Sequence, residues 1–189
     1  MFKIIDDDDI SCQIPTSIPQ GSAVNLDCLT HIVNHARISS LISKRLATAK
    51  AFRQTPKQII ESVCELSRHI EEWRESLPPF LQPVVPIKSN ELPPNVHLYH
   101  VMYIRYAYFG SVMAIHSIFT YPWNSAVFGA NQSSALHSQI SLSTNIVVEA
   151  ARSIIIATKY VDVDASSPIW YVPSKLYLNY KLYVPVKAC

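Results

Sequence analysis

Residues 55–79 read TPKQIIESVCELSRHIEEWRESLPP, the most clearly specified element of the chain. Thr55 is a favoured helix N-cap, Pro56 suits the first helical position, and Gln58 completes a capping box. Apolar side chains then recur every three or four residues: Ile59, Val63, Leu66, Ile70, Trp73 and Leu77. The opposite face carries charges: Lys57, Glu61, Glu65, Arg68, Glu72 and Glu75. Two prolines end the pattern, so we predict an amphipathic helix with one buried face.

Two further segments show helical periodicity with a recognisable apolar stripe. The stripe of residues 25–48 comprises Leu26, Leu29, Val33, Ala36, Leu41 and Leu46. The stripe of residues 134–160 comprises Leu136, Ile140, Val147, Ala151, Ile154 and Thr158. The pair Ala150-Ala151 adds a small-residue patch where another helix can approach closely. We therefore predict a helix over each segment.

Residues 95–119 are apolar on nearly all sides and rich in aromatic residues. A helix without a polar face belongs at the centre of a bundle. The run 98–119 is also long enough to span a bilayer. Arg105 lies near its middle, where it would cost about 2.5–3.5 kcal/mol in a membrane. We therefore predict a buried core helix and no membrane partner.

Composition supports helices and a domain larger than this segment. Only 3 glycines but 13 prolines occur, which favours helices joined by proline-marked loops over sheets with tight glycine turns. Charged residues make up 16%, against about 25% in typical soluble domains. So few charges leave apolar surface exposed unless further chain covers it. The predicted fold is an all-α, irregular multi-helix bundle that forms part of a larger helical domain.

Residues that could carry chemistry are sparse. The four cysteines form no Cys-x-x-Cys pair and have no histidine at metal-ligand spacing: Cys12, Cys28, Cys64 and Cys189. His31 and His35 share a helix face without a third ligand, and His97 and His100 are expected to pack in the core with satisfied hydrogen bonds. No nucleophile elbow, Walker loop or dinucleotide fingerprint is present. We expect no catalytic, cofactor-binding or metal-binding residues, and no enzyme.

The net charge of +2, with no cluster of Lys and Arg on one face, argues against nucleic-acid contact by this segment. The strongest local charge is negative, at residues 6–9, and two prolines follow it. Residues 1–22 therefore read as an extended, acidic lead-in without a core of its own.

Five motifs appear in an order that resembles one family. IDDDDI at 5–10, followed by Pro15, is similar to an acidic Ile-Asp-Asp-Glu-Asp-Ile…Pro signature. ARISSLI at 36–42 resembles the helix after it, and IEEWRESLPP at 70–79 resembles a Leu-x-x-Trp-x-x-x-Leu-Pro element. Residues 103–123 and EAARSI at 149–154 resemble two later helices. Together, over 4–172, they resemble the middle homology region of fungal zinc-cluster transcription factors, also called the fungal-specific transcription factor domain.

The sequence departs from this family pattern at two places. Ser117 and Ile118 replace a common Arg-Pro pair. After residue 170 the family continues with an apolar helix, whereas the chain continues with a Tyr-, Lys- and Pro-rich tail. The resemblance thus divides the chain into the lead-in 1–22, a helical middle homology region at 23–172, and an atypical tail at 173–189 that suggests truncation.

The resemblance implies a nuclear regulatory module that controls RNA polymerase II transcription without touching DNA. Zinc is expected only in a zinc-cluster domain upstream. The implied partners are transcriptional co-regulators or other parts of the same factor, a small-molecule effector, and a second copy of the chain. Two alternatives are a non-functional truncated gene product and a stand-alone helical binding or biosynthetic protein of fungal secondary metabolism. The pocket of that last alternative would be lined by Tyr99, Tyr103, Tyr106 and His116.

Overall fold

The computed structural model describes residues 13–22, 24–121, 128 and 134–160. All regular secondary structure in these ranges is helical, which confirms the predicted all-α class. The long helices are α1 (Leu26–Leu46), α2 (Pro56–Glu75), α3 (Leu98–His116) and α5 (Ser134–Ala157). Short 3₁₀ turns join or extend them, at Ala51–Arg53, Pro79–Leu81, Ser89–Glu91, Ser117–Phe119 and Thr158–Tyr160. The acidic motif at 5–10 and the tail at 173–189 lie outside the described residues.

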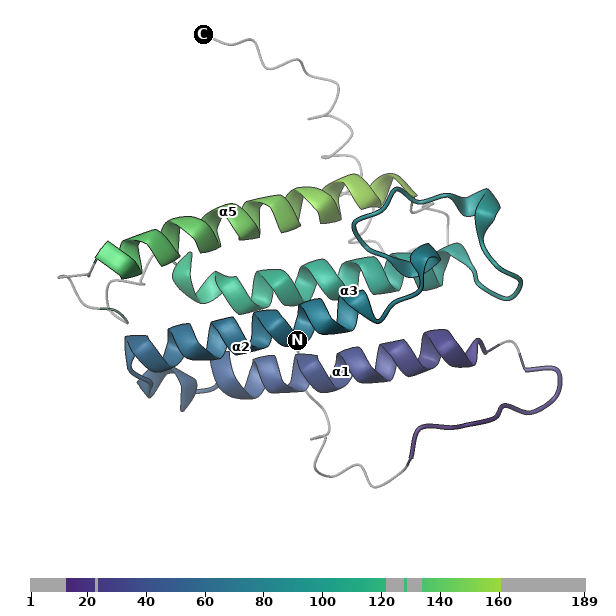
Figure 1. Ribbon diagram of the computed structural model, residues 1–189, viewed down its shortest axis with the longest axis horizontal. Coiled ribbons are helices and arrows are strands. Elements are labelled where there is room, and N and C mark those ends of the chain that lie inside the picture. Colours follow the sequence, from purple (N-terminus) through teal and green to yellow (C-terminus); the bar gives the residue numbers. More distant parts are fainter. Residues whose placement is uncertain (1–12, 23, 122–127, 129–133, 161–189) are drawn as a thin grey trace, which may run out of the picture.

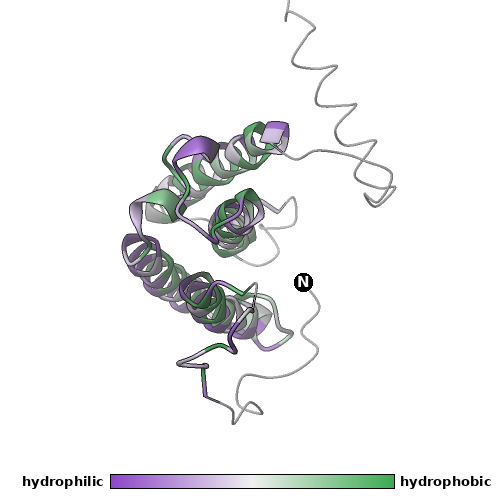
Figure 2. Ribbon diagram, turned by 90° about the vertical axis from the view of Figure 1, so that its right-hand side faces the viewer, coloured by the Kyte–Doolittle hydropathy of each residue, from purple (hydrophilic) through white to green (hydrophobic). Residues whose placement is uncertain are grey.

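Successive helices run in alternating directions, as the colour gradient of Figure 1 shows. Helix α3 lies between α5 on one side and α1 with α2 on the other, and the view down the helix axes in Figure 2 shows the same order. The buried residues of all four helices form one hydrophobic cluster. The nearly all-apolar segment is therefore central, as its sequence predicts.

Helix α2 agrees with its sequence in detail. Gln58 N–H donates to Thr55 Oγ1 at 3.4 Å, and Thr55 N–H donates to Gln58 Oε1 at 2.9 Å, which completes the capping box. All six residues of its predicted apolar stripe are buried. On the solvated face, Arg68 pairs with Glu72 at 2.5 Å. Amphipathic periodicity and capping thus fix both the ends and the orientation of this helix.

Trp73 lies on the apolar face of α2, and because the segment 95–119 is apolar on nearly every side, we predict from the sequence that the two pack together. Both Trp73 and that segment belong to the hydrophobic cluster, but the directed contacts of Trp73 are with α1. Its indole N–H donates to the His31 carbonyl at 3.0 Å, and its ring lies 5.0 Å from the His35 ring. No sequence pattern predicts this contact with α1.

Helix α1 faces the core with a different stripe from the predicted one. Its buried residues are Cys28, His35, Ser40, Ile42 and Leu46, whereas Ala36 of the predicted stripe is exposed. Because His35 and Ser40 are among the buried side chains, the face that is turned to the core is not the face that hydropathy alone selects. The start is as predicted, because Asn25 Oδ1 accepts from Cys28 N–H at 2.9 Å and caps the helix.

The buried seam of α5 overlaps the predicted stripe but is rotated from it: Leu136 is buried as predicted, whereas Ile140 and Ile154 are only partly buried against the core. Its most buried residues are spaced seven apart: Leu136, Ser143, Ala150 and Ala157. That spacing keeps one seam against a neighbouring helix, and α3 is that neighbour. Apolar residues also face solvent, among them Leu142 at 54% and Ile156 at 56% exposure. Because α5 is apolar on several sides, periodicity could not single out the seam.

The segment Leu136–Tyr160 is, within the described residues, the one helix long and apolar enough to cross a membrane by length and composition. Only 17% of its most apolar window is buried. The run at 98–119, weighed for a membrane role on its sequence, is instead the central helix of the bundle.

Candidate functional site

A cavity of about 700 Å³ lies between α1 and α3 in the described part of the chain. We call it the α1–α3 cavity. The α1 side contributes His35, Ser39, Ile42, Ser43, Leu46 and Ala47. The α3 side and its extension contribute Tyr103, Tyr106, Ala107, Gly110, Ser111, Ala114, Ser117, Ile118 and Tyr121. Its volume lies in the range of about 300–1,000 Å³ that small-molecule sites occupy.

His35 anchors the α1 wall of this cavity to α3. Its Nε2 lies 3.0 Å from the Ala107 carbonyl and 2.8 Å from Ser111 Oγ. A carbonyl can only accept, so Nε2 carries the proton in this contact. Burial lowers the pKa of His35, and the hydrogen bond to Ala107 opposes that shift. The imidazole is therefore neutral near pH 7, which confirms the expectation of a satisfied structural histidine.

Small side chains form the α3 wall. Ala107, Gly110, Ser111 and Ala114 follow one another at helical spacing on the cavity side. A Cβ atom built on Gly110 would have no neighbour within 4 Å. Gly110 and Ala114 are exposed although their helix is the central one. The backbone of α3 therefore forms an open floor rather than a packed contact.

Only two of the four residues expected to line the pocket of a stand-alone binding protein lie together in a cavity. Tyr103 and Tyr106 line the α1–α3 cavity. Tyr99 is 61% exposed and packs on His97 and His100, with its ring 4.0 Å from that of His100. His116 lies in a different network, described below. Tyr99 shares the helix face of Tyr103 and Tyr106 by its spacing but is not among the residues that line the cavity, and His116 lies on another side of the helix.

His97 and His100 form the start of α3. The backbone N–H of His97 donates to His100 Nδ1 at 3.0 Å, so the His100 ring caps the first turn. Burial and the nearby His97 lower the pKa of His100. His100 is buried as predicted, whereas His97 is exposed, so the predicted core packing holds for His100 only.

A second polar cluster joins α2, α3 and α5. His116 Nε2 lies 3.3 Å from Ser67 Oγ, and its Nδ1 lies 3.0 Å from Ser143 Oγ. Gln139 Nε2 donates to the same Ser143 oxygen at 3.0 Å. Burial lowers the pKa of His116, and the group that orients its ring is a hydroxyl rather than a carboxylate. These hydrogen bonds join side chains of the three helices.

Near this cluster, α2 and α3 are also joined by a buried phenol. Tyr108 O–H donates to Glu71 Oε1 at 2.5 Å, and Arg74 Nε donates to the other Glu71 oxygen at 2.6 Å. Burial, together with the Glu71 carboxylate, raises the pKa of Tyr108. The phenol therefore stays protonated and acts as a donor.

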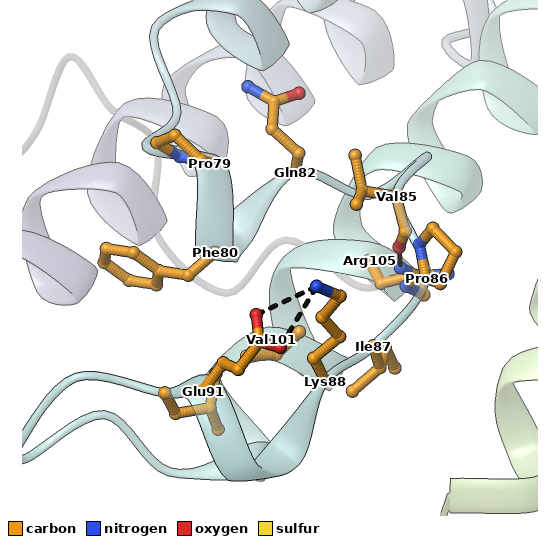
Figure 3. Close-up of a pocket in the computed structure, with 11 residues that line it drawn as sticks. Pro79, Phe80, Gln82, Val85, Pro86, Ile87, Lys88, Glu91, Val101 and Arg105 are labelled. Atoms are coloured by element: carbon orange, nitrogen blue, oxygen red, sulfur yellow. Dashed lines mark hydrogen bonds and ion pairs between the residues drawn. The ribbon is translucent and has the colours of Figure 1, made fainter.

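A smaller cavity of about 370 Å³ lies beside the connector between α2 and α3. Figure 3 shows the Lys88–Glu91 ion pair at its edge and Arg105 reaching the Val85 carbonyl. Arg105 Nε is buried without a hydrogen-bond partner among the described residues. Burial lowers the pKa of the Arg105 guanidinium, which nevertheless titrates far above neutrality. The cavity is thus bordered by a fixed positive charge, and the local ion pair closes one side.

Metal-ligating residues do not gather in the described ranges, where no group of three or more His, Cys, Asp or Glu could hold an ion. Of the two histidines at i, i+4 spacing, His35 is bound to α3 through its ring Nε2, and His31 accepts the Trp73 indole N–H through its backbone carbonyl. Cys28 is buried, which raises its thiol pKa, and Cys64 is exposed. Cys12 and Cys189 lie outside the described residues.

Fold and cavity together define the class of protein: an all-α chain with a ligand-sized, uncharged cavity. Comparison with known proteins adds a relationship. The chain is 28% identical to an "ABC-transporter-regulating transcription factor" of Aspergillus oryzae, and 27% identical to one of the same name in Aspergillus fumigatus. Each alignment covers 199 positions and 97% of this chain. The chain is thus related to fungal transcription regulators.

This chain spans about a fifth of the length of these relatives, since each alignment covers 21% of the relative. No protein-family model matches the chain, and no solved structure matches it.

Proposed function

We propose that this chain is a regulatory segment of a fungal transcription factor that acts in the nucleus without contacting DNA and without catalysis. The observation that carries the proposal is the alignment of 97% of the chain with two transcription factors. The order of motifs that resemble the middle homology region agrees with it. The finer assignment to that region, and the zinc cluster it implies upstream, are part of the proposal.

Surface charge supports the absence of DNA contact. Many basic side chains in the described helices already pair with carboxylates of the same chain: Arg45–Glu65, Lys57–Glu61, Arg68–Glu72, Arg74–Glu71, Lys88–Glu91 and Arg152–Glu149. Paired charges of both signs give no continuous basic face, which nucleic-acid binding requires. We expect no sequence-specific shift of duplex DNA at physiological salt, and no stoichiometric zinc by elemental analysis. A specific shift or one tightly held zinc per chain would contradict these parts of the proposal.

A reporter experiment tests the regulatory role. The chain is inserted between a heterologous DNA-binding domain and an activation domain, and reporter transcription is compared with that of the uninterrupted fusion. We expect the insertion to change transcription at equal nuclear protein level. The control insertion carries Leu66→Asp, which places a charge in the fully buried core and unfolds the chain at equal length. Equal transcription from folded and unfolded insertions would refute a regulatory role.

The proposed partners are co-regulators or other parts of the same factor, a small-molecule effector, and a second copy of the chain. Exposed apolar residues on α5 motivate the last: Leu142, Val148, Ile155 and Ile156. We expect the isolated chain to sediment as oligomers or aggregates. A monodisperse monomer over a wide concentration range would remove self-association from the proposal.

A further inference from the structure

We propose that the α1–α3 cavity binds an uncharged, largely apolar organic molecule that carries at least one hydrogen-bonding group. This inference extends the effector named above by giving its site and its chemical class. It rests on the proposed function only for its biological use, because binding itself is measured without transcription.

The first argument is the shape of the site. Two helical stripes face each other across about 700 Å³, His35 to Leu46 on α1 and Tyr103 to Ile118 on α3 with its extension. Tyr103 is 45% exposed and so borders an opening to solvent. A ligand of drug-like size can therefore enter between the helices and bury most of its surface.

The second argument is Gly110. Glycine in a helix interior costs about 1 kcal/mol relative to alanine. Here neither geometry nor packing requires it, because it has ordinary helical φ and its missing Cβ would meet nothing within 4 Å. A glycine allows a ligand to approach the backbone closely. Gly110 faces the cavity. Although this glycine lowers the stability of the protein without ligand, its presence is explained if a ligand needs to reach the backbone there.

The third argument is charge. Among the described residues, those that line the cavity include no Asp, Glu, Lys or Arg. His35 is neutral near pH 7, since burial lowers its pKa. A charged ligand would lose its hydration without gaining a countercharge, which is strongly unfavourable. An uncharged ligand meets no such penalty.

The fourth argument is the supply of hydrogen-bonding groups at the wall. Hydroxyls line both sides, with Ser43 on α1 and with Tyr103 and Ser111 on α3. Because His35 Nε2 donates, Ser111 Oγ at 2.8 Å accepts from it, and the Ser111 O–H remains a donor at the cavity wall. A few placed polar groups in an apolar lining orient a ligand and set specificity.

The test uses three probes with one aromatic body: neutral 1-naphthol, anionic 1-naphthoate and cationic 1-naphthylmethylammonium. Binding to the full chain is measured by saturation-transfer NMR and isothermal titration calorimetry. We expect 1-naphthol to bind at least about tenfold more tightly than either ion. Equal or tighter binding of an ion would overturn the assignment of ligand class.

Two leucine variants locate the site. Gly110→Leu places an apolar side chain in the open cavity, and helix propensity predicts a melting temperature no lower than wild type. We expect it to weaken 1-naphthol binding by at least about tenfold. The matched control, Ser141→Leu, adds the same side chain at an exposed position of α5 and should leave binding unchanged.

Undiminished binding to Gly110→Leu would overturn the proposal. So would a Gly110→Leu variant that loses self-association instead of probe binding, because that result would show that the cavity face packs against protein. Failure of probe binding leaves the reporter result untouched, so the two proposals fail separately.

Discussion

Removing the Trp73 side chain should cost more stability than any other single truncation on α2. The indole is 5% exposed, donates to the His31 carbonyl at 3.0 Å, and packs 5.0 Å from the His35 ring. Large-to-small changes of buried aromatics cost about 3–5 kcal/mol, which includes the cavity left behind. Trp73→Phe keeps most of the packing but removes the hydrogen bond to the His31 carbonyl, which is still satisfied within α1, so it should cost about 0.5–1.5 kcal/mol. Domains are stable by about 5–15 kcal/mol, so the alanine variant approaches unfolding.

The measurement is urea unfolding followed by far-ultraviolet circular dichroism, which reports the helices and does not depend on Trp fluorescence. We expect the free energy of unfolding to fall in the order wild type, Trp73→Phe, Trp73→Ala at similar m-values. Glu72→Ala, next to it on the solvated face, is the control and should change stability by less than about 0.5–1 kcal/mol. Surface substitutions usually change the free energy of unfolding by less than about 0.5 kcal/mol. If the free energies of unfolding of Trp73→Ala and of the control differ by no more than about that amount, the contact between α1 and α2 described above is wrong.

Three further predictions concern a cap, a glycine and the buried histidines. Thr55→Ala removes the capping-box hydroxyl of α2 and should lower the free energy of unfolding by about 1 kcal/mol, measured by the same urea titration; an unchanged midpoint would contradict the cap. Gly110→Ala should raise the free energy of unfolding by about 0.5–1 kcal/mol, because the added Cβ enters open space. A lower free energy of unfolding would show that this space is filled. Burial lowers the pKa of His35, His100 and His116 below 6.5, so on acidification the unfolded chain binds protons before the folded chain does. The free energy of unfolding should therefore fall as the pH drops below about 6.5. Urea titrations at about pH 7.5 and about pH 5.5, on either side of the ordinary histidine pKa, would contradict neutral, buried rings if they gave the same free energy of unfolding.

Helix α2 could be predicted from the sequence almost residue by residue. Its apolar and charged positions separate cleanly, and the Thr55–Gln58 capping box marks its start. Two independent local signals, periodicity and capping, agree there. When local signals agree with each other and with the buried face, tertiary contacts stabilise the same structure that the local sequence favours.

The rotations of α1 and α5 could not be predicted in the same way. On α1, His35 and Ser40 are buried while Ala36 is exposed, which reverses the order of hydropathy. On α5, the inward seam includes Ser143, whereas Leu142 beside it faces solvent. Polar residues turn inward in both helices, and at His35 and Ser143 hydrogen bonds to other helices account for it. Those partners lie 27 and more residues away in sequence, so no local pattern contains them.

Only part of the α1–α3 cavity, Tyr103 and Tyr106 on its α3 wall, could be predicted from the sequence, for a related reason. It exists only because one stripe of α1 faces one stripe of α3, and the α1 stripe was assigned to the wrong side. A signal was nevertheless present in the sequence. Gly110 interrupts a long apolar helix in a chain with only three glycines, and such a glycine indicates either a close contact or an open floor.

Hydrogen bonds, rather than apolar pattern, fix the rotation of the central helix. Because α3 is apolar on nearly every side, turning it about its axis would bury a similar apolar area in many orientations. Two histidine contacts break this degeneracy: His35 reaches Ala107 and Ser111 from α1, and His116 reaches Ser67 on α2 and Ser143 on α5. A rotation would leave several buried polar groups unpaired, at about 1–3 kcal/mol each. Buried polar contacts of this kind select one arrangement among several that are equally apolar. The selected arrangement is the one that turns Gly110 toward the cavity.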